Sequence, residues 1–162
     1  MRLHDIRPQK TLTVVTMTLG VQTLAIPAHL LREILDPLPV TRVPGAGPHV
    51  PGVVNVRGSV VPLADLKHAL SIPDEGHDDR RRILVLEVVL GGEVAVVAIS
   101  ADAVHEVTTI ETQAIEPVPV SAQGWPPDYL TGLYRGAQGF VLIPALETIF
   151  SNLANRPMAN LL

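Results

Sequence analysis

The stretch GVVNVRGSVVPLADL, residues 52–66, contains the clearest fold signal in the chain. Two Val-rich runs, Val53–Arg57 and Val60–Leu63, flank the pair Gly58–Ser59. Short β-branched runs joined by a glycine-containing pair predict a β-hairpin with a tight turn. We expect Gly58 to adopt a positive φ, because glycine does so at no steric cost.

The same pattern occurs a second time. Residues 132–146, GLYRGAQGFVLIPAL, align with residues 52–66, and both stretches read glycine, apolar strand, turn, apolar strand and a leucine in a short helix. In the first copy, Asp65 is placed to cap that helix over Leu66–Leu70, since its carboxylate can accept from the free N–H groups of the first turn. A repeat of this size predicts a duplicated small barrel, and a closed barrel leaves no exposed strand edges.

The remaining apolar runs are short and are separated by glycine or proline, which also favours β structure. A helix is expected between Pro27 and Pro37, because Leu30, Leu31, Ile34 and Leu35 would share one helical face. Gly91–Gly92 predicts a further hairpin turn. Other expected strands or extended segments cover residues 12–19, 23–26, 83–90, 94–99, 104–110, 114–118, 129–133 and 140–143, with a last short helix over 145–150.

The length of 162 residues fits one domain. We expect this domain to cover residues 12–151 and to consist of two interleaved barrel subdomains. Residues 1–11 and 152–162 are expected to be tails. The acidic loop at about 71–80 is the best candidate for a boundary, and a Pro-rich loop is expected at residues 123–127.

Charge and composition exclude several classes of protein. The net charge is −4 and the basic cluster Arg80–Arg82 directly follows acidic residues, so no surface suited to nucleic acid is expected. The absence of cysteine excludes disulfides and thiolate metal sites, and it fits a reducing compartment. The apolar runs are shorter than a bilayer span and no signal-peptide core is present, so we expect a cytoplasmic protein without direct membrane insertion.

No set of residues in the sequence suggests catalysis. The six histidines show no metal-ligand spacing, and Gly-x-Ser-x-Gly and phosphate-binding glycine loops are absent. We therefore expect no enzyme activity, no cofactor and no bound metal.

Several stretches resemble one known family. Residues 49–70, HVPGVVNVRGSVVPLADLKHAL, are similar to the central signature of CheW-like domains. Residues 24–34, 102–107 and 128–133 are similar to three further family motifs, in family order, so the resemblance extends from about residue 12 to 151. It implies a mainly β fold of two five-stranded SH3-like barrels packed around a shared apolar core, with short helices.

The resemblance also implies a function. Members act as scaffolds in chemotaxis signal transduction, coupling the cytoplasmic tip of a methyl-accepting chemoreceptor to the regulatory domain of a CheA-type histidine kinase. The protein would then be cytoplasmic and recruited to membrane receptor arrays. Two alternatives remain open: an adaptor of a non-flagellar pathway, and a small-molecule-binding or structural β-barrel.

Family analogy places a receptor-binding groove on the first copy of the repeat. Arg57 has two interpretations, because a guanidinium in an apolar hairpin needs acceptors: it either ties loop carbonyls together or is partly exposed at the groove. Gly52 either lets the strand start abruptly or lets a partner approach closely, and Leu31 is either core or groove. The proposed receptor-binding residues are Leu31, Glu33, Gly52, Asn55, Arg57 and Gly58. Leu130, Leu133 and Tyr134 are candidates for a kinase-facing surface, with core packing as the alternative.

Overall fold

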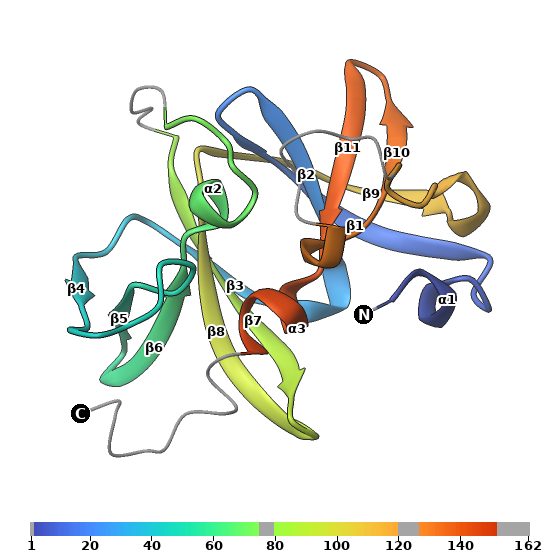
Figure 1. Cartoon of the computed structure of the whole chain (residues 1–162). Helices are drawn as coiled ribbons and strands as arrows, with labels where there is room; N and C mark the ends of the chain where they lie inside the picture. The colour runs from blue at the N-terminus through green and yellow to red at the C-terminus, as the bar shows by residue number, and fades with distance from the viewer. Residues whose placement is uncertain (1, 75–79, 120–126, 152–162) are drawn as a thin grey trace.

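The computed structural model describes residues 2–74, 80–119 and 127–151, and it confirms a mainly β fold with short helices (Figure 1). The strands form two sheets. The five-stranded sheet contains β10 (Leu130–Gly136), β11 (Gly139–Pro144), β2 (Gln22–Pro27), β1 (Thr11–Leu19) and β9 (Ala103–Glu111), in that order. The six-stranded sheet contains β3 (Leu31–Leu35), β7 (Arg82–Leu90), β8 (Glu93–Ala101), β6 (Ser59–Ala64), β5 (Gly52–Val56) and β4 (Val40–Arg42).

The two sheets repeat one strand order and exchange one strand. The order β5-β6-β8-β7-β3 matches β10-β11-β2-β1-β9, and in both sheets the hairpin joins its neighbour by a parallel pairing. The exchange arises because β3 pairs with β7, whereas β9 pairs with β1. The six-stranded sheet therefore uses one continuous segment, residues 31–101, inserted between β2 and β9.

The loop expected as a boundary lies within the segment that forms one sheet. The loop at 71–80 lies between α2 (Leu66–Ala69) and β7, inside the segment that builds the six-stranded sheet. Strands on both sides of it are hydrogen-bonded together, since β6 pairs with β8, so the loop separates no barrels. Residues 75–79 of this loop, most of the predicted loop at 123–127 and the predicted tail at 152–162 lie outside the described residues.

The predicted helix between Pro27 and Pro37 is also wrong. A single 3-10 turn, η1 (Ala28–Leu30), is followed by β3, which pairs antiparallel with β7. The segment Leu31–Leu35 alternates between partly buried and exposed residues, so it fits a strand as well as a helix. Pairing with β7 decides between the two, because it satisfies the backbone of the strand.

Three predictions that depend on one short segment each are confirmed. Asp65 caps α2, where its Oδ1 accepts a hydrogen bond of 3.0 Å from the backbone N–H of His68. The turn Gly91–Gly92 joins β7 and β8 with positive φ values of 58° and 83°. The last helix forms as α3 (Leu146–Ile149). The predicted segment 114–118 contains the end of a 3-10 turn, η2 (Thr112–Ala114), and one isolated bridge between Glu116 and Leu133.

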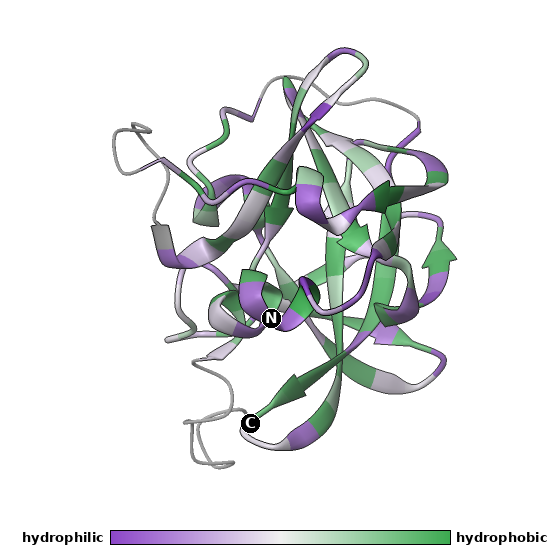
Figure 2. Ribbon diagram, turned by 90° about the vertical axis from the view of Figure 1, so that its right-hand side faces the viewer, coloured by the Kyte–Doolittle hydropathy of each residue, from purple (hydrophilic) through white to green (hydrophobic). Residues whose placement is uncertain are grey.

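The largest core cluster lies between the two sheets, as the resemblance implies. It combines Leu24 of β2, Leu84 of β7 and Leu142 of β11 with Phe150 at the end of α3, all of them fully buried. Figure 2 shows the apolar stretches on the strands that run through the middle of the molecule. A residue of Leu or Phe size buried in this way contributes roughly 1.5–3 kcal/mol, so this cluster holds the sheets together.

Asp102, at the crossing from β8 to β9, ties several elements together. Its Oδ2 accepts a hydrogen bond of 2.7 Å from the backbone N–H of Gly20, in the β1–β2 turn. Lys67 of α2 donates to Asp102 at 3.0 Å and to Asp74 at 2.9 Å. Burial opposes the charge of Lys67, but the hydrogen bonds and charges of the two carboxylates outweigh it and raise the pKa of Lys67.

The N-terminal segment contributes to the second core cluster. Helix α1 (Leu3–Ile6) buries Ile6, and Arg7 donates a hydrogen bond of 3.1 Å to the carbonyl of Ile115. Within residues 2–74, 80–119 and 127–151, no helix combines the length and apolar character needed to cross a membrane.

Equivalent residues of the two copies meet between the sheets. The carbonyl of His49 accepts from the N–H of Asp65, and the carbonyl of Tyr129 accepts from that of Ala145, each at 2.8 Å. The ring centroids of His49 and Tyr129 lie 5.0 Å apart, edge to face. The ring centroid of His68 lies 5.2 Å from that of His49, and the buried Nδ1 of His49 has no hydrogen-bond partner in the described part of the chain.

This cluster predicts a pH dependence of stability. Burial first, and then the charge of His68, lower the pKa of His49, while the carboxylate of Asp65 partly offsets both. The unfolded chain therefore takes up a proton below about pH 6.5 that the folded chain does not, and the free energy of unfolding falls as pH drops below that value.

The variant His49→Phe keeps a ring against Tyr129 and removes the titration. In urea denaturation, we expect it to lose less stability than the wild type between about pH 7.5 and pH 5. His29→Gln, on the exposed residue of η1, is the matched control and should follow the wild type. Parallel pH profiles for His49→Phe and the wild type would contradict this interpretation.

Candidate protein-binding groove

A groove of about 460 Å³ opens between β3 and the end of the β5–β6 hairpin. Its floor is apolar and its rim is charged. The floor contains Val56, Val61, Val85 and Val96, and the rim contains Arg32, Glu33, Arg57, Ser59 and Val60. An apolar floor with a polar rim is the arrangement that protein interfaces share.

An ion pair between two predicted residues crosses this groove. Nη1 of Arg57, in the hairpin turn, donates to Oε1 of Glu33, on β3, at 2.6 Å. The Arg57 side chain is 72% exposed, whereas that of Glu33 is 21% exposed. Among the described residues, Arg57 makes no hydrogen bond to a loop carbonyl, so the structure favours the exposed interpretation. An exposed pair of this kind contributes about 0–1 kcal/mol to stability.

Asn55 and Gly58 shape the turn that carries Arg57. Arg57 and Gly58 have φ values of 51° and 87°, and two successive positive φ values are typical of a type I′ hairpin turn. The positive φ expected for Gly58 is confirmed, although the turn is centred one residue earlier than predicted, at Arg57–Gly58. Oδ1 of Asn55 accepts from the backbone N–H of Gly58 at 2.7 Å and so stabilises the turn.

Gly52 and Leu31 lie away from the groove. A Cβ at Gly52 would lie 2.7 Å from the carbonyl oxygen of Thr41 and 2.8 Å from the Val40 side chain. The absence of a side chain at Gly52 thus allows the close approach of β4. Leu31 is half-buried and packs against the core cluster between the sheets.

The three residues considered for a kinase-facing surface are buried. Leu130, Leu133 and Tyr134 expose 6%, 5% and 6% of their surface and belong to core clusters, as the alternative of core packing requires. Burial first, and then the charge of Glu106, raise the pKa of Tyr134. A partner that binds here would therefore contact exposed residues beside these three.

Sequence reasoning missed the exposed apolar residues beside these sites. Val60 is 73% exposed at the groove, and Ile34 is 44% exposed on β3. In the repeat alignment Val60 corresponds to Phe140, which is 50% exposed and lies under the guanidinium of Arg135. The alignment itself could have found this shared position, since it places an apolar residue two positions after each turn.

The two copies differ at the ion pair. Arg57 aligns with Ala137, so the turn of the second hairpin has no cation at the position that faces Glu33 in the first copy, and Glu33 aligns with Glu106. Both Ala137 and Glu106 line a second cavity, of about 540 Å³, at the equivalent place. The Arg57–Glu33 ion pair therefore has no equivalent at the aligned positions of the second copy.

Comparison with known proteins identifies the family. The model of the CheW-like domain matches residues 13–154. The chain belongs to the CheW-like domain family. A probable chemotaxis protein CheW of Rhizobium etli is 26% identical over 137 residues, which cover 85% of this chain and 86% of that protein. The chemotaxis protein CheW of Klebsiella aerogenes is 29% identical over 135 residues, 83% of this chain and 79% of that protein.

The fold agrees with this family. The crystal structure of the scaffolding protein TtCheW from Thermoanaerobacter tengcongensis superposes with a TM-score of 0.76 at 24% identity, covering 91% of this chain and 92% of that one. As a CheW-like protein, the chain is a scaffolding and coupling protein of chemotaxis signal transduction, and it is not an enzyme. Its function is to bind signalling partners, so its surfaces rather than a reactive centre determine what it does.

Proposed function

We propose that this CheW-like protein couples the cytoplasmic tip of a methyl-accepting chemoreceptor to the regulatory domain of a CheA-type histidine kinase. It would do so in the cytoplasm, recruited to receptor arrays at the membrane. The groove crossed by the Arg57–Glu33 ion pair is the observation that carries this proposal, because it combines an exposed guanidinium with an apolar floor.

The receptor tip fits this groove by its chemistry. A helical hairpin presents an amphipathic face, and such a face binds by placing apolar side chains in a groove while charges pair at the rim. Val60 offers exposed apolar surface, and Arg57 offers donors beyond the one that binds Glu33. Asn55 and Gly58 act indirectly, by holding the turn that presents Arg57.

For the kinase we propose the outer end of the β10–β11 hairpin. Phe140 is half exposed there and Arg135 lies 5.6 Å from the centre of its ring, whereas Leu133 and Tyr134 support the hairpin from inside. Aromatic and arginine side chains dominate the affinity of many interfaces. This surface lies on the opposite sheet from the Arg57 groove, so both partners can bind at once.

Titration calorimetry with the purified kinase regulatory domain tests the kinase contact. We expect binding in the micromolar range for the wild type, and at least tenfold weaker binding for Phe140→Ser. Val89→Ser, at an apolar residue that is 56% exposed on the other sheet, is the matched control and should bind normally. Absence of binding by a folded wild-type chain would instead favour the alternative of a structural or small-molecule-binding barrel.

A further inference from the structure

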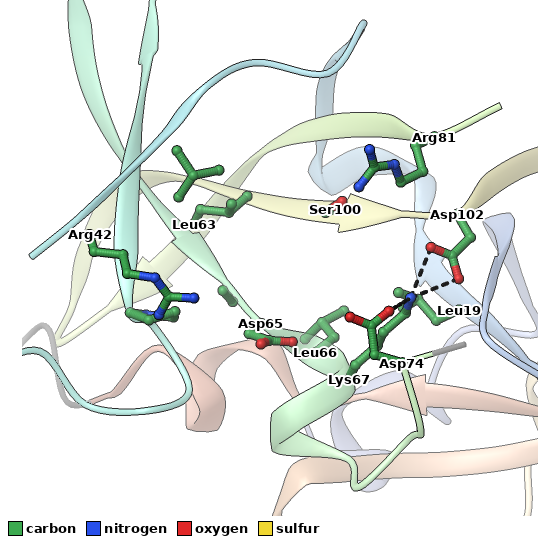
Figure 3. Close-up of a pocket in the computed structure, with 13 residues that line it drawn as sticks. Leu19, Arg42, Leu63, Asp65, Leu66, Lys67, Asp74, Arg81, Ser100 and Asp102 are labelled. Atoms are coloured by element: carbon green, nitrogen blue, oxygen red, sulfur yellow. Dashed lines mark hydrogen bonds and ion pairs between the residues drawn. The ribbon is translucent and has the colours of Figure 1, made fainter. Parts of the chain in front are cut away.

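A cavity of about 480 Å³ lies apart from the groove, between β4, the residues before β7 and the start of α2 (Figure 3). None of its lining residues lines the Arg57 groove. Its volume falls within the range of about 300–1,000 Å³ that small-molecule sites occupy. Figure 3 shows Arg42 and Arg81 on opposite sides of this space, with Lys67, Asp74 and Asp102 together below Arg81.

The charged side chains that line the cavity differ in whether they form ion pairs. Lys67 is neutralised by Asp74 and Asp102, and Asp65 accepts the capping hydrogen bond of α2. Arg42 and Arg81, by contrast, form no ion pair within the described part of the chain. The cavity therefore holds two guanidinium groups that form no ion pair with a described carboxylate, while its three aspartates equal its three basic side chains in number.

Arg81 adds a second observation. Its Nε is buried and has no hydrogen-bond partner among the residues that the structure describes. A buried donor without an acceptor is rare in folded proteins, and a ligand oxygen in the cavity reaches this one only when the Arg81 side chain turns toward it. Ser100 lies on the same wall and supplies a hydroxyl, while Leu63 and Leu66 line the cavity with apolar surface.

We propose that this cavity binds a carboxylate that carries an apolar group. The planar carboxylate matches the forked donors of Arg81, with Arg42 adding charge from the opposite wall. The apolar group would lie on Leu63 and Leu66. The ligand is either a free organic acid or an acidic side chain of a bound protein, since both offer the same chemistry.

The test is a titration of the full-length, ¹⁵N-labelled protein followed by NMR, in which the Nε–Hε signal of Arg81 reports on the orphan donor directly. The two probes are benzoate and the capped tripeptide acetyl-Leu-Glu-Leu-amide. We expect a saturable shift of the Arg81 signal and of the Ser100 amide with at least one probe. Tighter binding of benzoate would identify a free acid as the natural type of ligand, and tighter binding of the tripeptide would identify a protein side chain.

Variants distinguish specific binding in this cavity from nonspecific attraction of anions to the protein. Arg81→Gln and Arg42→Gln should each weaken binding of the probe at least tenfold. For Arg81→Gln, which lacks the Arg81 signal, binding is measured from the Ser100 amide. Lys10→Gln removes a positive charge at an exposed residue outside both the cavity and the groove, and it should bind the probes as the wild type does. The proposal is overturned if neither probe gives a saturable shift, or if the cavity variants bind as the wild type does. Receptor and kinase binding are separate measurements, so this result is independent of the proposed coupling function.

Discussion

The variant Arg57→Glu is expected to bind the chemoreceptor tip about thirtyfold more weakly than the wild type, a loss of about 2 kcal/mol that is typical of a residue central to an interface. The substitution removes the exposed guanidinium and places a second carboxylate opposite Glu33, where the wild type has an ion pair of 2.6 Å. Repulsion between the carboxylates would open the groove as well as remove the contact. Calorimetry with a purified receptor cytoplasmic fragment measures the change.

Two further variants distinguish loss of charge from damage to the turn. Arg57→Asn removes the charge but suits the left-handed backbone at this position, where φ is 51°. It should keep the fold and still weaken binding. Lys10→Glu makes the same charge reversal at an exposed site outside the groove and serves as the control.

The double variant Glu33→Arg with Arg57→Glu restores an ion pair in the opposite direction. Recovery of binding would show that the pair acts by holding the groove in shape, and continued loss would show that Arg57 contacts the receptor itself. Normal binding by Arg57→Glu alone would remove this groove from the receptor interface.

A large loss of stability is expected on substitution of Gly52 or Gly132, the glycines that begin the aligned stretches 52–66 and 132–146. Gly52→Val and Gly132→Val are each expected to lower the free energy of unfolding by about 3 kcal/mol. The added side chain would collide with backbone atoms, which cannot move aside without losing their own contacts. A Cβ at Gly52 would lie 2.7 Å from the Thr41 carbonyl oxygen, and one at Gly132 would lie 2.8 Å from that of Glu116. The two copies thus use glycine for the same purpose, to let a neighbouring segment pair closely.

Urea denaturation followed by circular dichroism measures both variants. Ser59→Val places the same side chain at an exposed strand position of the first hairpin, and it should change stability by no more than about 0.5 kcal/mol. A loss below about 1 kcal/mol for either glycine variant would show that the neighbouring segment moves aside easily. Such an outcome for Gly52 would reopen its interpretation as a site of partner approach.

Features that depend on neighbouring residues in sequence were predictable. The Asp65 cap, the Gly91–Gly92 turn and the positive φ of Gly58 each follow from the chemistry of one short segment. The strand β3 was not predictable in this way, because its apolar pattern suits a helix and only β7, far along the chain, provides its hydrogen bonds. The exchange of β3 and β9 between the sheets has the same origin, since a repeat shows which units are equivalent but not how they pair.

The same distinction, between features of a short segment and features of the tertiary fold, applies to the candidate sites. Arg57 and Glu33 could be selected from motifs, but their ion pair depends on the sheet curling until β3 meets the hairpin turn. Leu130 is buried in the cluster between the sheets and Tyr134 in the second core cluster, and the sequence of one strand does not reveal this tertiary packing. Arg42 and Arg81 were not candidates, because only the folded chain brings them to one cavity.

In the proposed function, one chain binds two signalling proteins at once. Calorimetric titration of a receptor cytoplasmic fragment into this protein, already saturated with the kinase regulatory domain, tests the claim most directly. We expect saturable binding with an affinity close to that measured without the kinase domain, because the two proposed surfaces lie on different sheets. Displacement of the kinase domain by the receptor fragment, or no binding of the fragment to a folded chain, would contradict the account.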